Sequence, residues 1–329
     1  MGFHGDPLSG RYSITDPAGV EIILGLRAPQ KRISSKYFYD DKGTELFQKI
    51  SQTPEYYLTL CEKEILKKYA VNILDYMDHD PFSIIELGAG DGSKAALLLT
   101  QALKNKNFQN YYAVDISAKA LNELSDNLEE QFDNFVPHTL EADFFDGLAQ
   151  IESQALERRI VLFLGSSLGN LLPQQAHEFL QSLAHNMREQ DLLVLGLDLK
   201  KDERILSKAY NDKQGLTAEF NLNLLTRINR EWGANFNLDN FEHMEVYNPG
   251  LGAMESYLMS KVEQTVFFED FNTEIHFAEG ELIHTEYSFK YNKADIMGLI
   301  QDTGLTVQDF LYDRRRYFTT VLLRGPSRH

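Results

Sequence analysis

Cysteine is almost absent from this sequence, because Cys61 is the single one among 329 residues and no disulfide can form within the chain. That scarcity fits a reducing compartment, and an isolated cysteine more often serves as a small buried hydrophobic side chain than as a nucleophile. We therefore expect Cys61 to be buried. The expected location of the protein is the cytoplasm.

Long hydrophobic runs are also missing. No apolar stretch approaches the roughly 18 residues that a membrane-spanning helix needs. The opening segment, MGFHGDPLSGRYSITD, lacks the basic start and the apolar run of a secretory signal. The sequence thus predicts a protein without a membrane span, and no internal repeat or low-complexity linker interrupts it.

Positive charge is the third scarcity. The chain has 32 lysine and arginine residues against 49 aspartate and glutamate residues, which gives a formal net charge of −17. A surface this acidic argues against nucleic acid or an anionic membrane as a partner. A basic run, DRRRY at 313–317, is expected to lie in the turn of a final hairpin instead.

What the sequence does contain is an alternation of strand-like and helix-like segments in its middle. Strands are expected at 83–87, 110–115, 136–142, 159–164 and 191–198, and helices at 93–104, 118–131 and 174–187. Such alternation predicts a parallel sheet with helices on both faces. Two earlier helices, at 44–50 and 60–78, are expected from the spacing of their apolar residues.

The pattern changes after residue 198. Residues 203–232 have helical spacing in two pieces, and residues 240–290 have the alternation and turn signals that suit antiparallel strands. A helix at 293–302 and strands at 305–312 and 317–323 then complete the first sheet. We expect an α/β fold with a Rossmann-like nucleotide-binding core (61–200 and 290–329), an α+β substrate-binding domain (10–60 and 201–289) and the active site between them.

A glycine-rich loop follows the first strand of the alternation, in IIELGAGDGSKAALLL at 84–99. Gly88, Gly90 and Gly92 let backbone approach a ligand closely, because glycine has no Cβ and adopts positive φ readily. Their G-x-G-x-G spacing differs from the G-x-G-x-x-G of dinucleotide-binding loops. Glu86 would repel a pyrophosphate and suits a ligand that carries an ammonium or a sulfonium.

Two acidic residues follow the next two strands. Asp115 ends the second strand, where a carboxylate can accept both hydroxyls of a ribose. Asp143 and Phe144 follow the third, where an acid beside an aromatic ring can bind and stack on adenine. Together with the glycines, these residues match S-adenosylmethionine better than NAD. Each acid alone is also compatible with a helix cap, and the glycines alone with a tight turn.

Longer motifs resemble a known family. They are KYFYDDKGTELFQKI, PEYYLT, ELGAGDGSK, VDIS, FLGSSLGN, DLKKDERILSKAYND, GLTAEFNLNLLTRINRE and TEYSFKY, in order over roughly residues 30–325. The set resembles the histidine-specific Nα-methyltransferases. That resemblance implies a class I methyltransferase fold and the cofactor S-adenosylmethionine. It also implies stepwise trimethylation of L-histidine to hercynine, the first step of ergothioneine synthesis.

The resemblance also implies roles for single residues. It places the cofactor on Gly88, Gly90, Lys94, Asp115, Asp143 and Phe144, beside Glu86. It places the histidine carboxylate on Tyr56, Asn170 and Tyr210. It places the imidazole on Glu286 and Ser288, and the amine near Tyr39 and the backbone from Gly165 to Ser167. Tyr39 is expected to orient the nitrogen rather than to act as a base.

General chemistry is compatible with these roles. Tyrosine and asparagine can bind a carboxylate without adding charge, and a glutamate can accept an imidazole N–H. Glu286 and Ser288 stand two apart, so on a strand both side chains point to one face. A solvent-facing strand would show the same spacing.

One position departs from the family pattern. The histidine pocket of the family commonly carries a bulky side chain in the strand after the N-P turn, where this sequence has Ser256 in AMESYL. A small residue there widens the pocket, so methylation of another amino acid or amine is an alternative. Glu286 argues against an indole, which has one N–H donor and no basic nitrogen.

Two further hypotheses stay open. GSSLG at 165–169 satisfies the G-x-S-x-G pattern of serine hydrolases around Ser167, and a non-catalytic ligand-binding protein could keep the same fold. A metal site is not expected, because the eight-residue separation of His276 and His284 matches no familiar ligand spacing. The expected partner is a small amino-acid substrate, and the expected state is a monomer.

Overall fold

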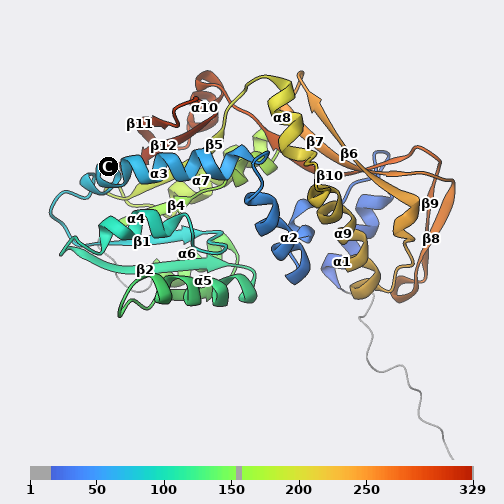
Figure 1. Cartoon of the computed structure of the whole chain (residues 1–329), viewed down its shortest axis with the longest axis horizontal. Coiled ribbons are helices and arrows are strands. Elements are labelled where there is room, and N and C mark those ends of the chain that lie inside the picture. The colour runs from blue at the N-terminus through green and yellow to red at the C-terminus, as the bar shows by residue number, and fades with distance from the viewer. Residues whose placement is uncertain (1–15, 153–157, 328–329) are drawn as a thin grey trace, which may run out of the picture. The chain divides into compact units, whose positions relative to one another are not determined.

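The computed structural model describes residues 16–152 and 158–327, which form two compact units (Figure 1). The large unit contains Ser51–Ala209, Tyr247–Met254 and the described part of Tyr287–His329. The small unit contains the described part of Met1–Ile50, Tyr210–Val246 and Glu255–Glu286. The sequence-based expectations for the first fifteen residues lie outside the described part of the chain.

The large unit is built on a seven-stranded sheet. Its order is β11-β12-β5-β4-β1-β2-β3. The strands are β1 (Phe82–Leu87), β2 (Phe108–Asp115), β3 (His138–Glu141), β4 (Arg159–Phe163), β5 (Leu192–Asp198), β11 (Thr306–Tyr312) and β12 (Phe318–Arg324). Neighbours from β5 to β3 pair in parallel, and β12 pairs antiparallel with both β5 and β11. Every residue of β1, β4 and β5 is buried, including Glu86, Arg159 and Asp198, and the mostly apolar sequences of these strands are typical of central parallel strands.

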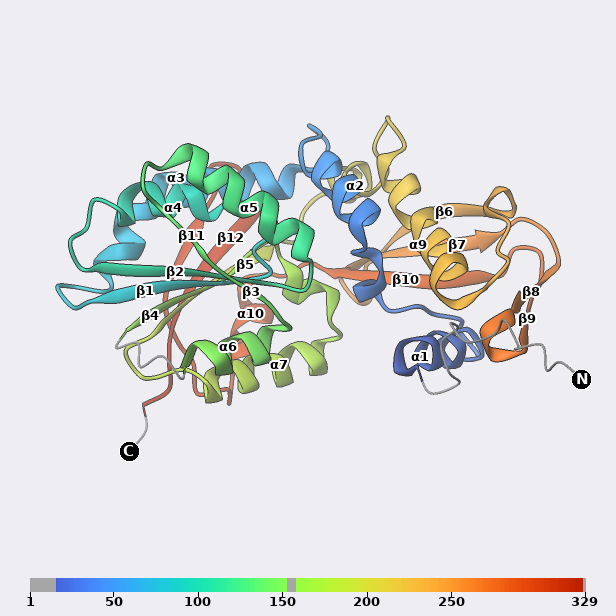
Figure 2. The ribbon, with the colours of Figure 1, turned by 90° about the horizontal axis from the view of Figure 1, so that it is seen from below.

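Helices cover both faces of this sheet, as Figure 2 shows. One face carries α3 (Tyr57–Asp75), α4 (Ala95–Ala102) and α5 (Ala118–Gln131), and the other carries α6 (Phe144–Glu152), α7 (Pro173–His185) and α10 (Lys293–Ile300). Local signals set their starts: Ser117 caps α5, Pro173 opens α7, and Asn292 forms a capping box with Asp295 at α10. The expected α/β sheet is thereby confirmed.

The small unit combines helices with short strands. Its helical segments are α1 (Pro17–Leu26), η1 (Ser35–Phe38), α2 (Asp41–Ser51), α9 (Leu216–Trp232), η3 (Leu238–Asn240) and η4 (Glu269–Phe271). The strands β8 (Gln264–Phe268) and β9 (Thr273–Phe277) pair antiparallel. A second sheet has the order β10-β7-β6, made of β6 (Phe241–Asn248), β7 (Ala253–Ser260) and β10 (Leu282–Phe289), which continue into the large unit.

Some elements differ from the sequence-based expectation. The helices α1 and α6 were not expected, whereas the two-piece helical segment is confirmed as α8 (Glu203–Tyr210) and α9. Within residues 16–152 and 158–327, every helix is too short or too polar to cross a membrane. Cys61 is a free, buried thiol, and burial raises its pKa to about 11, which confirms its expected role as a core side chain.

Candidate active site

The glycine loop lies at the carboxyl end of β1, where open α/β sheets bind their ligands. Gly88, Gly90 and Gly92 all have positive φ, at 73°, 54° and 71°. Among the described residues other than Gly90 and its two chain neighbours, no heavy atom lies within 4 Å of the position that a Cβ on Gly90 would take. The backbone of this loop is therefore exposed to a ligand at Gly90, and a side chain there would strain it.

Asp115 connects this loop to the next helix. One oxygen of its carboxylate accepts the amide of Gly90 at 3.0 Å, and the other accepts the amide of Ser117 at 3.0 Å. Asp115 stays partly exposed at the end of β2. The remaining lone pairs of the carboxylate are the ones that a ribose can use.

Asp143 and Phe144 lie where the third strand passes into α6. The carboxylate of Asp143 accepts the amides of Phe145 and Asp146, both at 2.9 Å, so it caps this helix. The ring of Phe144 lies 3.5 Å from the position of a Cβ on Gly88. Asp143 therefore has the capping role that a single acid can have, and Phe144 lies against the glycine loop.

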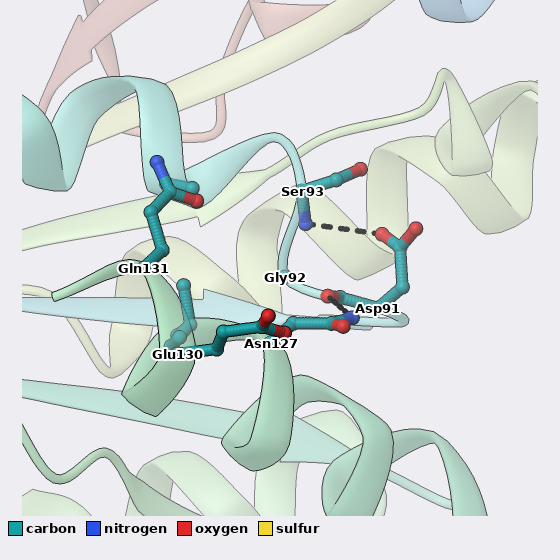
Figure 3. A pocket seen from close by; sticks show the side chains of 8 residues that line it. Asp91, Gly92, Ser93, Asn127, Glu130 and Gln131 are labelled. Atoms are coloured by element: carbon teal, nitrogen blue, oxygen red, sulfur yellow. Dashed lines mark hydrogen bonds between the residues drawn. The ribbon is translucent and has the colours of Figure 1, made fainter.

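A hollow of about 470 Å³ lies beside the same loop (Figure 3). It is lined by Asp91 and Ser93 from the loop and by Asn127 and Glu130 from α5. The amide of Asn127 donates to the carbonyl of Asp91 at 3.1 Å. Gly92 of the glycine loop also lines the hollow, but Gly88, Gly90, Asp115 and Phe144 do not.

Glu86 is turned into the interior. Its side chain is 1% exposed, and it accepts a hydrogen bond from the Tyr111 hydroxyl at 2.6 Å. Burial raises the pKa of Glu86 to about 8, against the opposing effects of Tyr111 and Lys94. The carboxyl group is thus mostly protonated at neutral pH, and its expected contact with the cofactor stays a prediction.

Lys94 follows the glycine loop and begins α4. Its ammonium lies 3.0 Å from a carboxylate oxygen of Glu62, which comes from α3. Burial works to lower the pKa of Lys94, but the neighbouring Glu62 outweighs it, and the net shift is upward. Lys94 is therefore a fixed positive charge at the edge of the loop.

The segment after β4 carries three predicted substrate residues. Gly165 has a φ of 81°, and its amide donates to both oxygens of Glu62, at 3.0 and 2.9 Å. Ser167 is exposed and donates to the carbonyl of Leu164 at 3.2 Å, and Asn170 ends a short helix, η2 (Ser167–Asn170). Ser166 has a left-handed backbone, and its hydroxyl accepts the amide of Asp198 at 2.9 Å. The segment is thus anchored at both Gly165 and Ser166.

A buried charge cluster lies at the end of β5. Asp198 accepts hydrogen bonds from Tyr57 at 2.6 Å and from Lys201, and it pairs with Lys290 at 2.9 Å. Lys290 also donates to the hydroxyl of Ser288 at 2.7 Å. Burial favours a higher pKa for Asp198, but the two lysines outweigh it and lower this pKa. The cluster holds Ser288 of the predicted imidazole site, and sequence reasoning missed Asp198, Lys201 and Lys290.

The predicted site residues of the small unit lie on several elements. Tyr39 is half-buried, with its ring edge-on to Phe47 at 5.8 Å and to Phe220 at 5.9 Å between centroids. Tyr210 is buried, and its carbonyl is 3.3 Å from a ring nitrogen of His243. These contacts place the ring of Tyr39 and the backbone carbonyl of Tyr210.

The two strands that carry Ser256 and Glu286 are also connected. Ser256 is 2% exposed in β7, and its carbonyl accepts the hydroxyl of Thr285 at 3.0 Å. The same hydroxyl contacts Asn221 of α9 at 3.0 Å. Glu286, next to Thr285 in β10, is half-buried. Ser256 thus occupies an interior position, where the size of its side chain affects the space available.

The comparison with known families decides the identity. A model of the family described as histidine-specific, S-adenosylmethionine-dependent methyltransferases matches residues 18–325. The chain belongs to this family. The resemblance seen in the sequence motifs is therefore confirmed, and the fold is that of a class I methyltransferase.

Named relatives agree with the family. A histidine N-alpha-methyltransferase from Mycolicibacterium smegmatis is 34% identical over 87% of this chain and 88% of its own. A histidine N-alpha-methyltransferase from Mycobacterium tuberculosis is 33% identical over the same shares. Ergothioneine biosynthesis protein 1 from Schizosaccharomyces pombe is 31% identical over 82% of this chain and 36% of its own. This methyltransferase thus spans most of the length of the two bacterial relatives.

Within the large unit, the structure brings predicted residues of the methyltransferase together in two groups. In the first group, Asp115 and Phe144 contact the glycine loop that contains Gly88 and Gly90. In the second, Lys94 and Gly165 both donate hydrogen bonds to Glu62. Tyr56, Ser167, Asn170 and Ser288 belong to the same unit, and Tyr39, Tyr210, Ser256 and Glu286 to the other. A single pocket formed by all of the substrate residues stays a prediction.

The remaining expectations from the sequence concern a hydrolase motif, a metal site and the basic run. Membership in a methyltransferase family argues against a serine hydrolase, and no histidine of the described chain is hydrogen-bonded to Ser167. Among the described residues, no three His, Cys, Asp or Glu side chains are grouped to hold a metal ion. The basic run lies in the turn between β11 and β12, as expected, where Asp313 accepts the amides of Arg315, Tyr317 and Phe318.

Proposed function

We propose that this enzyme transfers methyl groups from S-adenosylmethionine to the α-amine of L-histidine, in three steps that end at hercynine. The observation that carries the proposal is the family match over residues 18–325, which spans both units. The bacterial relatives named as histidine N-alpha-methyltransferases support the same substrate. The relative named for ergothioneine biosynthesis supports a place at the first step of that pathway.

In this proposal the cofactor binds to the large unit, at the carboxyl ends of its parallel strands. Gly88 and Gly90 would receive it at the loop, Asp115 the ribose, and Asp143 with Phe144 the adenine. S-adenosylmethionine supplies a methyl group on a sulfonium, which is already a good leaving system. The protein then mainly has to position the nitrogen and exclude water.

The substrate would be held by neutral donors at one end and an acid at the other. Tyr56, Asn170 and Tyr210 would bind the carboxylate, and Glu286 with Ser288 the imidazole. Tyr39 and the backbone at Gly165 would orient the amine. The nitrogen must present a free lone pair, so the substrate ammonium loses its proton to water or a nearby acceptor before each transfer.

Ser256 supports a second candidate, an Nα-methyltransferase of the same family that acts on another amino acid or amine. The position is buried, so the exchange of a bulky side chain for a hydroxyl changes the space that lines the strand. Glu286 favours a ring with a donor and a basic nitrogen. We therefore place histidine ahead of other amines.

We propose further that the protein works as a monomer in the cytoplasm and binds no nucleic acid. The net charge of −17 supports the last point, because phosphate backbones repel an acidic surface. Light scattering on the purified chain tests the monomer, and a mass equal to twice that of the chain would contradict it.

Calorimetric titration tests the substrate. With S-adenosylhomocysteine present, we expect L-histidine and its dimethylated form to bind and L-tryptophan to give no heat. Glu286→Gln should weaken histidine binding about tenfold, since it removes the negative charge that favours the protonated ring. Binding of S-adenosylhomocysteine without any binding of histidine would contradict the histidine assignment and direct attention to Ser256. The variant Ser256→Met then tests whether a bulky side chain restores the site.

A further inference from the structure

Glu62 is a charged side chain on the apolar face of a helix. It lies in α3 between Leu58, Cys61, Ile65 and Leu66, all of which are buried, and is itself 1% exposed. Buried carboxylates are rare unless they are paired and hydrogen-bonded. Its partners therefore explain why the helix carries an acid at this position.

Those partners come from two different loops. The two oxygens of Glu62 accept the amide of Gly165 at 3.0 and 2.9 Å, and one of them accepts the ammonium of Lys94 at 3.0 Å. Lys94 follows the glycine loop, and Gly165 follows β4. One buried carboxylate thus joins the segment expected to hold the cofactor to the segment expected to hold the substrate amine.

The surrounding structure leaves space for this arrangement. A Cβ on Gly196 of β5 would lie 2.0 Å from a carboxylate oxygen of Glu62, so only glycine leaves room for the acid there. A Cβ on Gly165 would lie 3.1 Å from the ammonium of Lys94. The contact between the two segments is therefore close on both sides of the carboxylate.

We propose that Glu62 is a positioning residue that couples cofactor binding at Lys94 to substrate binding at Gly165. This inference rests on the proposed function for the roles of these two residues. A ligand that contacts the ammonium of Lys94 weakens the bond between Lys94 and Glu62. The Glu62 carboxylate then accepts a stronger hydrogen bond from the amide of Gly165. By thermodynamic linkage, the substrate acts on the cofactor by the same factor.

The test is a binding cycle on the whole chain. Calorimetry measures the Kd of L-histidine with and without S-adenosylhomocysteine, and the ratio of the two values is the coupling factor. The variants are Glu62→Gln, which keeps the shape and removes the charge, and Glu62→Asp, which keeps the charge and shortens the reach. Glu64→Gln is the matched control, because Glu64 lies on the same helix, is exposed, and accepts only the amide of Arg314 in the described contacts.

We expect a coupling factor of about ten or more in the wild type and in Glu64→Gln, within the range usual for coupled sites. In Glu62→Gln it should fall to about one or two. An unchanged factor in a folded Glu62→Gln, or no coupling in the wild type, would overturn the inference. If Glu62→Gln fails to fold, the coupling factor is measured in Glu62→Asp instead. A fall to about one or two supports the inference, and an unchanged factor overturns it.

Failure of the proposed function gives a different result. In that case S-adenosylhomocysteine binds to the wild type but L-histidine does not. The binding of S-adenosylhomocysteine is then the only readout: a difference of about tenfold in its Kd between Glu62→Gln and Glu64→Gln supports the contact through Lys94. Equal binding to the two variants overturns it.

Discussion

Glu86 belongs to a motif expected to bind a ligand, and its carboxyl group is also a buried ionisable group. It stands two residues before the first glycine of the loop, yet its carboxyl group is 1% exposed and accepts the Tyr111 hydroxyl. Burial raises its pKa from 4.5 to about 8. The folded protein therefore binds a proton that the unfolded chain releases between these two values, and stability falls as the pH rises through this window.

Replacement of Glu86 by glutamine removes this pH dependence. At pH 4 the variant and the wild type should unfold at similar urea concentrations. At pH 8 the variant should be more stable by roughly 2–5 kcal/mol, because it has no proton to lose. Urea unfolding without ligand at several pH values measures the difference. Parallel pH profiles for the two proteins would contradict the raised pKa, and Glu64→Gln serves as the exposed control.

At the residue scale, the sequence predicted where a residue lies along an element better than it predicted the direction in which the side chain points. The motif places Glu86 at the end of a strand, but it does not say that the side chain turns toward Tyr111 in the interior. Glu62 carried a signal that was available in the sequence, namely an acid among apolar residues with helical spacing. The partners of that acid were not available, because Lys94 and Gly165 come from loops 32 and 103 residues away.

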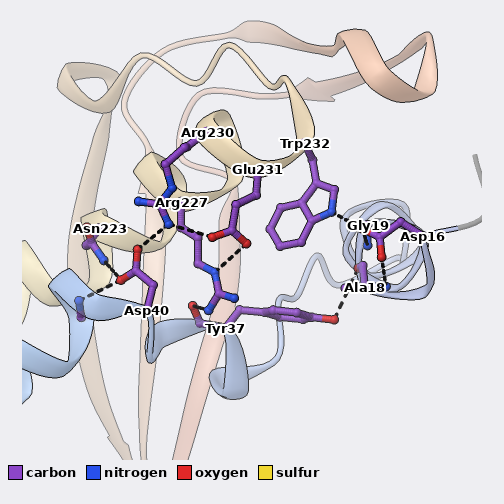
Figure 4. A network of polar contacts seen from close by, with 11 residues as sticks. Asp16, Ala18, Gly19, Tyr37, Asp40, Asn223, Arg227, Arg230, Glu231 and Trp232 are labelled. Carbon is purple, nitrogen blue, oxygen red and sulfur yellow. Dashed lines mark hydrogen bonds and ion pairs between the residues drawn. The ribbon is translucent and has the colours of Figure 1, made fainter. Parts of the chain in front are cut away.

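At the scale of elements, α9 anchors the segment that carries Tyr39 (Figure 4). Asp40 accepts the amide of Gly43 at 2.8 Å and the side-chain amide of Asn223 at 2.8 Å. Arg227 donates to the carbonyl of Tyr37 at 2.9 Å, and Arg230 contacts Asp40 at 2.8 Å. The start of α2 is thus held from two sides.

Loss of Asp40 should loosen this segment. Asp40→Ala removes a helix-capping bond and the acceptor of Asn223, so we expect a loss of about 1–3 kcal/mol in the free energy of unfolding. Arg230→Ala is the graded control: its side chain is 54% exposed, and an exposed ion pair contributes about 1 kcal/mol or less. Equal losses in the two variants, measured by urea unfolding, would contradict the anchoring role of Asp40.

The positions of strands could be predicted from the sequence where every residue of the strand is buried. The central strands β1, β4 and β5 have mostly apolar sequences, so their positions were predictable. The helix α6 begins directly after Asp143, for which the sequence allowed both a ligand contact and a helix cap. The helix α1 is capped by Asp16, whose partner Trp232 is 216 residues away. Such tertiary contacts leave no local pattern.

For the whole molecule, the order in which the chain contributes to the two units matters as much as the elements themselves. The backbone passes five times from one unit to the other, at the boundaries that follow residues 50, 209, 246, 254 and 286. Neither unit is a continuous segment. The expected two-domain division places its boundaries elsewhere and stays a prediction, since strands such as β6, β7 and β10 contribute to both units.

A continuous fragment should therefore fail to fold. Residues 51–209 lack β12, which pairs with β5 along its whole length, from Phe318 opposite Asp198 to Arg324 opposite Leu192. The fragment would expose a long apolar edge, whereas the same fragment joined by a flexible linker to residues 287–329 covers it. Circular dichroism during thermal unfolding should show a cooperative transition only for the joined fragment. A cooperative transition in 51–209 alone would contradict this view.

The place of β12 between β5 and β11 has a consequence for biosynthesis. Of all the described elements, β12 leaves the ribosome last, yet it occupies an interior position in the sheet. Until it arrives, the nascent chain carries the mostly apolar strand β5 with one unpaired backbone edge that can pair with a neighbouring chain. The yield of this enzyme in a cell should therefore depend on chaperones that shield that edge while translation finishes.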